Sequence, residues 1–148
     1  MTRIMTKKTQ NNFEAFLRIL DANYNRAKEA LRVAEDLARF LMEDKILTAK
    51  FKKLRHDLTK ILLRFPVSYR RLVAARDSVE DVGKKSLIHD TPGRTRWQDL
   101  LTANLKRAQE AMRVLEEVSK VVAPRESGSF QHLRFSLYEL EKRTLQKF

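Results

Sequence analysis

Two asparagine–arginine pairs are the side chains of this sequence best suited to binding an anion. Asn23 and Arg26 recur as Asn104 and Arg107, 81 residues further along the chain. The guanidinium group of arginine is a planar fork of N–H donors that binds a phosphate through two parallel hydrogen bonds. With successive helical residues placed about 100° apart, both pairs fall within the apolar stripes of their helices, where a charged group needs an anionic partner. We therefore predict that the two pairs converge on a phosphorylated ligand.

Arg55 and Arg134 extend this cationic set, because they flank the apolar stripes of the two partner helices. We predict that these two arginines and Arg26 and Arg107 are the catalytic residues, and that Asn23 and Asn104 bind substrate. The alternative is that Arg26, and likewise Arg107, pairs with a glutamate of the other repeat and only holds the two long helices in register. The sequence favours neither interpretation over the other.

Four carboxylates complete the candidate site. Glu29 and Glu110 border the apolar stripes, so we predict that they bind substrate. A buried arginine, a ligand amine and a magnesium ion are the partners considered for them. Asp77 and Asp81 lie in the middle of the chain, where loop carboxylates can hold magnesium, and we predict that they are the metal ligands. Turn formation is the alternative role for both aspartates.

Other charged residues of the two motifs have a simpler interpretation. Arg32 and Arg113 lie opposite the apolar stripes and have glutamates three residues before and after them. This spacing is typical of exposed ion pairs along a helix, so we expect those pairs here. The chain has three histidines, His56, His89 and His132. Their spacing is not that of metal ligands.

An internal repeat indicates how these residues are positioned. Residues 20–35 match residues 101–116, and a weaker match relates Phe51, Leu54, Arg55 and Leu58 to residues 79 positions later. The duplicated unit is therefore a helix pair. We predict a single all-helical domain over residues 1–148, with repeat units at about 13–65 and 97–148 and a unique linker at 66–96.

The apolar residues around both motifs recur at helical spacing, and the chain has only three glycines and three prolines, so strands are not expected. We predict an all-α bundle of about five helices. The second helix runs from an N-cap at Asp44 to Phe65, because Pro66 stops it, and its counterpart begins at Ser129. A short helix covers residues 69–76, and a loop containing Val82-Gly83 and Thr91-Pro92-Gly93 follows.

The starts of the two motif helices stay open at this stage. If Asp21 and Thr102 are N-caps, Asn23 and Asn104 lie in first turns, where free backbone N–H groups favour anions. If the helices begin near Phe13 and Trp97, that support is absent. Residues 1–12 are polar and basic without an apolar segment, so we expect a frayed arm and no signal peptide.

A net charge of +12 and an isoelectric point near 10.2 indicate an anionic partner. Nucleic acid, an acidic membrane surface and a small phosphorylated ligand all have the required charge. We rank a nucleic-acid binder last, because the repeated arginines fall in the apolar stripe and form no exposed basic face with interleaved aromatics. The absence of cysteine and of a long apolar run leads us to expect a cytoplasmic protein that does not enter a membrane.

Several segments together resemble the helical domain that is fused to thiamin-phosphate synthase in many bacteria and archaea. The resemblance is carried by residues 19–33, Leu54-Arg55-His56, Arg76-Asp77, Asp81-Val82-Gly83 and residues 103–117. That domain has been assigned an alternative hydroxymethylpyrimidine-phosphate kinase activity. We expect the domain to occur alone here, since 148 residues leave no room for the barrel that carries the synthase reaction.

The resemblance implies that the protein moves the γ-phosphoryl group of ATP onto hydroxymethylpyrimidine phosphate, giving the diphosphate used in thiamin synthesis. It also implies ATP and Mg²⁺ as cofactors and a phosphorylated pyrimidine as substrate. The alternative is a non-catalytic binding or accessory domain for thiamin-phosphate synthase. Further partners that we consider are a separate synthase chain and a second copy of this chain.

Overall fold

The structure, a computed structural model, describes residues 6–85 and 95–148, and within these ranges it consists of helices, turns and short loops, without a strand. This confirms the predicted all-α fold with about five helices. A 3₁₀ turn, Pro124–Glu126, precedes the last helix. The five α-helices are α1 (Lys7–Phe40), α2 (Lys45–Leu63), α3 (Tyr69–Ala75), α4 (Trp97–Val122) and α5 (Ser127–Leu145).

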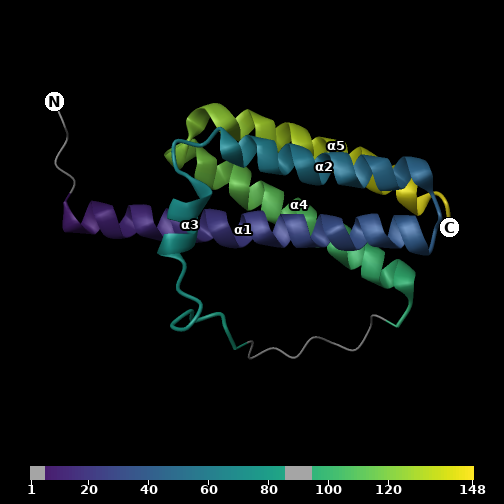
Figure 1. Ribbon diagram of the computed structural model, residues 1–148, viewed down its shortest axis with the longest axis horizontal. Coiled ribbons are helices and arrows are strands. Elements are labelled where there is room, and N and C mark those ends of the chain that lie inside the picture. Colours follow the sequence, from purple (N-terminus) through teal and green to yellow (C-terminus); the bar gives the residue numbers. More distant parts are fainter. Residues whose placement is uncertain (1–5, 86–94) are drawn as a thin grey trace.

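The four long helices form an antiparallel bundle in the cyclic order α1, α2, α5, α4 (Figure 1). Each repeat supplies one hairpin, α1 with α2 and α4 with α5, and the two hairpins pack so that α1 lies against α4 and α2 against α5. The contact between α1 and α4 is the most extensive in the molecule. The two copies of the motif therefore face each other across an approximate twofold axis.

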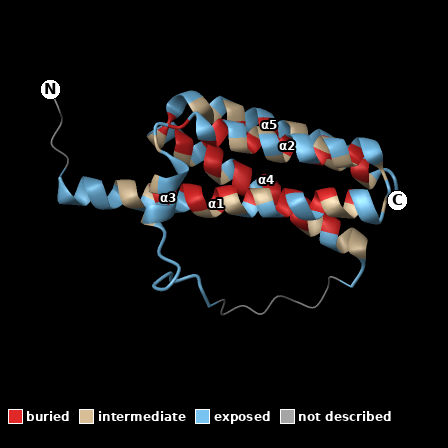
Figure 2. Ribbon diagram, in the orientation of Figure 1, coloured by how far each residue is buried: buried red, intermediate tan, exposed pale blue. Residues whose placement is uncertain are grey.

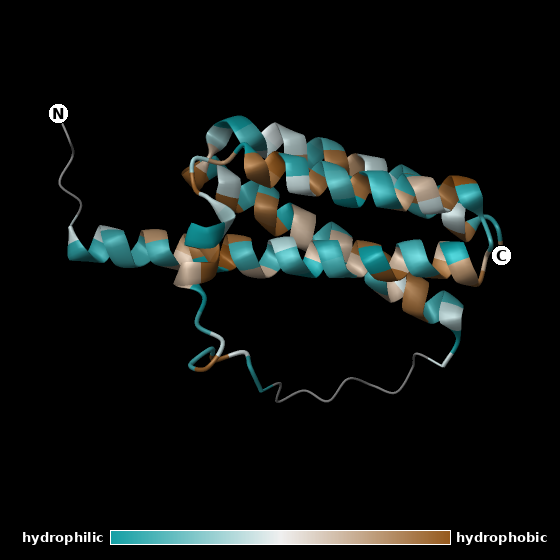
Figure 3. Ribbon diagram, in the orientation of Figure 1, coloured by the Kyte–Doolittle hydropathy of each residue, from teal (hydrophilic) through white to brown (hydrophobic). Residues whose placement is uncertain are grey.

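The core explains this arrangement. Buried residues lie on the sides of the helices that face one another, and these are also the hydrophobic sides (Figures 2 and 3). Where α1 packs on α4 the buried residues include four alanines, which let the two backbones approach closely. They are Ala27, Ala30, Ala108 and Ala111.

The predicted helix boundaries agree with the structure at the start of α2 and differ by one or two residues at several others. The Asp44 carboxylate caps α2 by accepting a hydrogen bond from the Leu47 backbone N–H at 2.9 Å, and α2 ends at Leu63, two residues before the predicted end at Phe65. The short helix α3 ends one residue before the predicted end, and α5 begins at Ser127 instead of Ser129. The predicted Thr91-Pro92-Gly93 turn and His89 lie outside the described residues.

The two motif helices begin well before their asparagines. α1 starts at Lys7 behind a Thr6 N-cap, which accepts a hydrogen bond from the Thr9 N–H, so the frayed arm predicted for residues 1–12 is wrong for residues 7–12. Residues 1–5 lie outside the described part. α4 starts at Trp97. Asn23 and Asn104 therefore lie within helices, and free backbone N–H groups do not assist them.

Charged contacts fix α3 on α1. Arg76, directly after α3, donates two hydrogen bonds to the buried Asp21 carboxylate, at 2.7 and 2.8 Å. The hydrogen bonds to Asp21, and in second place one to Tyr69, raise the pKa of Arg76 above its usual value.

Within the described residues, no helix has the length and apolar character needed to cross a membrane.

Candidate functional site

A pocket between the two motif helices contains most of the predicted site residues. It encloses about 500 Å³ and we call it the arginine pocket. From α1 it is lined by Asn23 and Arg26, and from α4 by Arg107, Glu110, Ala111 and Val114. The close approach of α1 and α4 at their alanines therefore brings residues 81 positions apart in the sequence into one cavity.

The two arginines of this pocket are exposed to solvent. Their predicted burial within the apolar stripe is wrong, because the stripe of α1 centres on residues such as Ala27 and Leu31 and Arg26 lies at its margin. Among residues 6–85 and 95–148 neither Arg26 nor Arg107 has an ion-pair partner within 4.0 Å. Two guanidinium groups with unused donors thus face the pocket from opposite repeats, an arrangement that suits a phosphate group.

The two asparagines occupy equivalent positions but differ in their access to the pocket. Asn23 and Asn104 are both buried, as predicted, and each donates a side-chain hydrogen bond to the backbone carbonyl four residues earlier, at 2.9 and 2.8 Å. Only Asn23 belongs to the lining of the arginine pocket. The approximate twofold symmetry is therefore broken at the candidate site.

The two glutamates after the arginines are separated in the same way. Glu110 lines the arginine pocket, whereas the exposed Glu29 of α1 is not among its lining residues. Glu110 is also the single carboxylate in the lining. The pocket therefore combines two cationic groups, one carboxylate and one amide.

Arg55 and Arg134 lie between the helices of their own repeats, away from the arginine pocket. Arg55 Nε donates to Glu35 Oε2 at 2.9 Å, and Arg134 Nε donates to Glu116 Oε2 at 3.0 Å, with Arg134 Nη2 in ion-pair contact with the same oxygen at 2.9 Å. All four side chains are at least 85% buried, with exposed fractions of 15% and 7% in the first pair and 10% and 5% in the second. The register-holding role, expected as an alternative for Arg26 and Arg107 with partners in the other repeat, is thus filled by Arg55 and Arg134 with partners inside their own repeats.

Glu35 and Glu116 were expected in exposed ion pairs with Arg32 and Arg113, but both glutamates are buried, and only Glu116 keeps a contact of this kind, with Arg113 Nη1 3.6 Å from its Oε1. Glu35 lies four residues after the buried Leu31, on the side of α1 that faces α2, and Glu116 is its counterpart in α4. The signal that could have identified them is the repetition of both partners, glutamate and arginine, in the two copies. Arg32 pairs with Asp36 at 3.4 Å and Arg113 with Glu117 at 3.2 Å; these pairs are exposed, as predicted, but their carboxylates are not the predicted glutamates.

Asp77 and Asp81, the predicted metal ligands, are exposed residues after α3. Asp77 Oδ1 accepts a hydrogen bond from the Glu80 backbone N–H at 3.0 Å, and Asp81 Oδ1 accepts one from the Gly83 N–H at 2.7 Å. These contacts are those of turn-forming aspartates. In the described part of the chain no group of three or more candidate ligands is arranged to hold a metal ion.

Comparison with known proteins supplies the family. The model of the ThiD2 family matches residues 18–143. The chain belongs to the ThiD2 family. The matched segment contains all the residues of the arginine pocket and both buried ion pairs. No solved structure matches the chain.

Curated relatives of this ThiD2 chain are named thiamine-phosphate synthases. The protein of Synechocystis sp. is 42% identical over 127 residues, which cover 86% of this chain and 35% of the relative. That of Rhodopirellula baltica is 36% identical over 122 residues, 82% of this chain and 32% of the relative. That of Nostoc punctiforme is 38% identical over 124 residues, 84% and 34% of the two chains. The chain therefore spans about a third of the length of these relatives.

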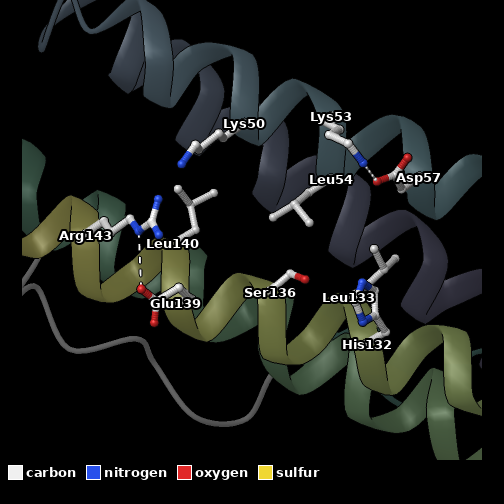
Figure 4. A pocket seen from close by; sticks show the side chains of 10 residues that line it. All are labelled: Lys50, Lys53, Leu54, Asp57, His132, Leu133, Ser136, Glu139, Leu140 and Arg143. Carbon is white, nitrogen blue, oxygen red and sulfur yellow. Dashed lines mark hydrogen bonds and ion pairs between the residues drawn. The ribbon is translucent and has the colours of Figure 1, made fainter.

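A second cavity lies between α2 and α5, and most of the charged side chains that line it are paired with one another. This α2–α5 groove, of about 380 Å³, lies on the opposite layer of the bundle and is lined by Lys53, Asp57, Glu139 and Arg143, among others. Figure 4 shows Lys53 turned toward Asp57 and Arg143 toward Glu139, each within its own helix. Because Lys53 and Arg143 have carboxylate partners, and among the described residues only Lys50 of the lining cations has none, the groove is a weaker candidate than the arginine pocket for binding an anion.

Proposed function

We propose that this ThiD2-family protein is a kinase of thiamin biosynthesis, which transfers the γ-phosphoryl group of ATP to hydroxymethylpyrimidine phosphate. The names of the relatives support the pathway, and the arginine pocket supports chemistry on phosphate groups. The reaction forms a bond between an oxygen of the acceptor phosphate and the γ-phosphorus, and breaks the bond between that phosphorus and the β–γ bridging oxygen. ADP leaves with the electron pair of the broken bond.

The observation that carries this proposal is the pair of arginines from opposite repeats at one pocket, without carboxylate partners in the described chain. Phosphoryl transfer depends mainly on positioning and on stabilising the charge of the phosphate oxygens. The acceptor is a phosphate monoester, whose second pKa lies near 6, so it is largely ionised at neutral pH and needs little help from a general base. Arg26 and Arg107 are suited to hold donor and acceptor phosphates next to each other.

Glu110 is the residue of the pocket suited to a magnesium ion. Mg²⁺ in phosphoryl-transfer sites is bound by one or two carboxylates together with substrate phosphates, so one carboxylate beside two arginines fits this requirement. When bound, the ion supplies neutralisation of phosphate charge. Asp77 and Asp81 stay predicted ligands on the segment after α3, in addition to their turn contacts.

Incubation with ATP, Mg²⁺ and hydroxymethylpyrimidine phosphate tests the proposal, with the product identified by mass. We expect the pyrimidine diphosphate and an equal amount of ADP. Arg26→Ala and Arg107→Ala should each lower kcat/KM about 100-fold or more, because each removes a donor that stabilises transition-state charge. Arg32→Ala and Arg113→Ala are matched controls on the same helices, since their side chains lie in exposed ion pairs. Full activity in both Arg26→Ala and Arg107→Ala, or no product from the parent protein, would contradict the proposal.

A second candidate function is a non-catalytic binding domain that acts with thiamin-phosphate synthase. The observation in its favour is that the matching segment is about a third of relatives that bear the synthase name. A protein that binds the pyrimidine phosphate, consumes no ATP and increases the activity of an added synthase would support this function. Product formation by the isolated chain would exclude it as the sole function.

A further inference from the structure

A separate cavity, which we call the tyrosine pocket, lies between α1, the end of α2 and the turn into α3. It encloses about 610 Å³, within the usual range of about 300–1,000 Å³ for small-molecule sites. Its lining includes Tyr24, Lys28, Thr59, Leu62, Phe65 and Tyr69, and none of its lining residues belongs to the arginine pocket. Since Lys28 and Arg26 are two residues apart, they lie about 200° apart around α1. The two pockets are therefore different sites.

The walls of the tyrosine pocket favour a flat ring. The rings of Tyr24 and Tyr69 meet edge to face, with centroids 6.1 Å apart. Leu62 and Phe65 contribute buried apolar surface. Aromatic side chains bind planar ligands through large apolar contact and through edge or offset packing. An aromatic ring is therefore the ligand group that matches these walls.

The polar groups of the pocket define what the ring should carry. Lys28 Nζ lies 3.3 Å from the Tyr24 hydroxyl, which is also 3.1 Å from Thr59 Oγ1. In residues 6–85 and 95–148, no carboxylate forms an ion pair with Lys28. An anionic substituent on the ligand would provide the missing partner, and the two hydroxyls can bond to heteroatoms of a ring.

The second repeat shows that this cavity is a departure from the symmetry of the bundle. At the equivalent place Gln109 stands for Lys28, and Glu141 stands for Leu62. There Gln109 Nε2 donates to Glu141 Oε2 at 2.8 Å, and Lys106 Nζ pairs with Glu141 at 3.0 Å. The polar groups of the second repeat thus satisfy one another, whereas in the first repeat Leu62 provides an apolar wall and leaves the lysine without a carboxylate.

We propose that the tyrosine pocket binds a planar heteroaromatic ring that carries a phosphate group, with the ring against Tyr24, Tyr69 and Phe65 and the phosphate at Lys28. This site is separate from the arginine pocket. Both substrates of the proposed kinase belong to this ligand class, so the identity of the natural ligand rests on the proposed function, whereas binding of the probes is tested without phosphoryl transfer. A nucleotide and a single-ring heteroaromatic phosphate share this chemistry. The size of the bound ring distinguishes these two sources.

Binding is tested by following the backbone amide signals of the ¹⁵N-labelled protein by NMR during titration. The probes are AMP and pyridoxine 5′-phosphate, with ribose 5-phosphate as the anion without an aromatic ring. We expect one or both heteroaromatic probes, but not ribose 5-phosphate, to shift the signals of Tyr24, Lys28 and Tyr69 at millimolar concentration or below. Binding of AMP alone or of pyridoxine 5′-phosphate alone supports the proposal and assigns the source. Shifts confined to Arg26 and Arg107, or equal shifts with ribose 5-phosphate, overturn it.

Two substitutions copied from the second repeat sharpen the test. Lys28→Gln replaces a partly exposed side chain with its counterpart and should weaken binding about tenfold or more, because it removes a charge-assisted contact. Leu62→Glu supplies the missing carboxylate, and should abolish binding if the variant folds. Arg26→Ala is the control in the arginine pocket and should leave the shifts at Tyr24 and Tyr69 unchanged. Unaltered affinity in Lys28→Gln contradicts the proposal, whether or not Leu62→Glu folds.

Discussion

Both repeats bury one glutamate–arginine pair between their helices, but the second repeat encloses its pair more completely. Arg55 makes one hydrogen bond, to Glu35, whereas Arg134 makes one to Glu116 and a second to the Tyr138 hydroxyl at 3.1 Å. The hydrogen bond to Tyr138, followed by the contact with Glu116, raises the pKa of Arg134 above its usual value. The buried ion pair has the same position in both hairpins, but the number of hydrogen bonds around it depends on neighbouring residues that differ between the repeats.

One of these neighbours is a tyrosine, which each repeat carries on a different helix of its pair. The first repeat has Tyr24 on α1 and Thr59 on α2, and the equivalent residues of the second repeat are Leu105 on α4 and Tyr138 on α5. The Tyr24 hydroxyl bonds to Thr59, while the Tyr138 hydroxyl bonds to Arg134. Residues common to both repeats thus hold the bundle together and supply the paired arginines, and residues that differ create the tyrosine pocket in one repeat only.

The largest difference between the repeats should appear when one partner of a buried pair is removed. Arg134→Met leaves the Glu116 charge buried without its main partner, which costs about 3–5 kcal/mol in typical buried pairs. Arg55→Met should cost less, because Arg55 makes fewer hydrogen bonds and is slightly more exposed. Urea unfolding followed by circular dichroism measures both free energies.

The matched control replaces both partners. In Glu116→Leu/Arg134→Met the buried charge is gone, so much of the lost stability should return. Equal costs for Arg55→Met and Arg134→Met would show that the extra contacts of the second repeat add no stability.

Asn23 and Asn104 allow the comparison to be made at the arginine pocket. Both side chains make the same hydrogen bond within their helix, so Asn23→Ala and Asn104→Ala should lower stability equally. Only Asn23 lines the pocket. Asn23→Ala should therefore lower kcat/KM of the proposed kinase reaction about tenfold, or about 1.4 kcal/mol, and Asn104→Ala much less. Equal kinetic losses would indicate that the site uses both repeats alike.

The sequence predicts the architecture well because the same helical pattern occurs in both repeats. Helical spacing, the Asp44 cap and Pro66 are local signals, and local signals determine where α2 begins and ends. The start of α1 was missed because Thr6 caps a polar and basic segment that carries little apolar periodicity.

The candidate site was predicted only in part, because helical phase resolves the centre of a stripe better than its margins. The helical phase placed Asn23, Arg26 and Arg107 at the interface between α1 and α4, where they line one pocket. It also placed both arginines inside the apolar stripe and the buried Glu35 and Glu116 outside it. Contacts between helices, such as the one between Asp21 and Arg76, have no local signal. The differences between the repeats required the packed structure.

The helix caps form a smaller contrast between the repeats. α2 has a side-chain cap from Asp44, while α5 begins after a 3₁₀ turn without one. Asp44→Ala should lower the free energy of unfolding by about 1 kcal/mol at neutral pH. The hydrogen bond from Leu47, then the contact with Lys147, lowers the pKa of Asp44 below its ordinary value of 3.8. This stabilisation is therefore present above that value and is lost as the pH falls through the lower pKa of the folded protein.

Unfolding measured from pH 7 to pH 3 checks this behaviour. The difference in unfolding free energy between the parent protein and Asp44→Ala should become smaller below about pH 4. Asp44→Asn is the control, since asparagine also caps helices but does not titrate. A constant difference across the whole range would show that the charge of Asp44 has no part in the cap.

The smallest effects are expected at the exposed ion pairs. Arg32→Ala should cost about 0.2–0.5 kcal/mol, because both partners in its pair with Asp36 are at least 44% exposed. Arg113→Ala should cost slightly more, since Arg113 also lies 3.6 Å from the buried Glu116. In 1 M NaCl the loss of unfolding free energy in Arg32→Ala should be much smaller, because salt screens exposed charges. A cost of Arg113→Ala that persists in salt would show that Glu116 is stabilised by both Arg113 and Arg134. The more enclosed ion pair of the second repeat would then be part of a network of three charges.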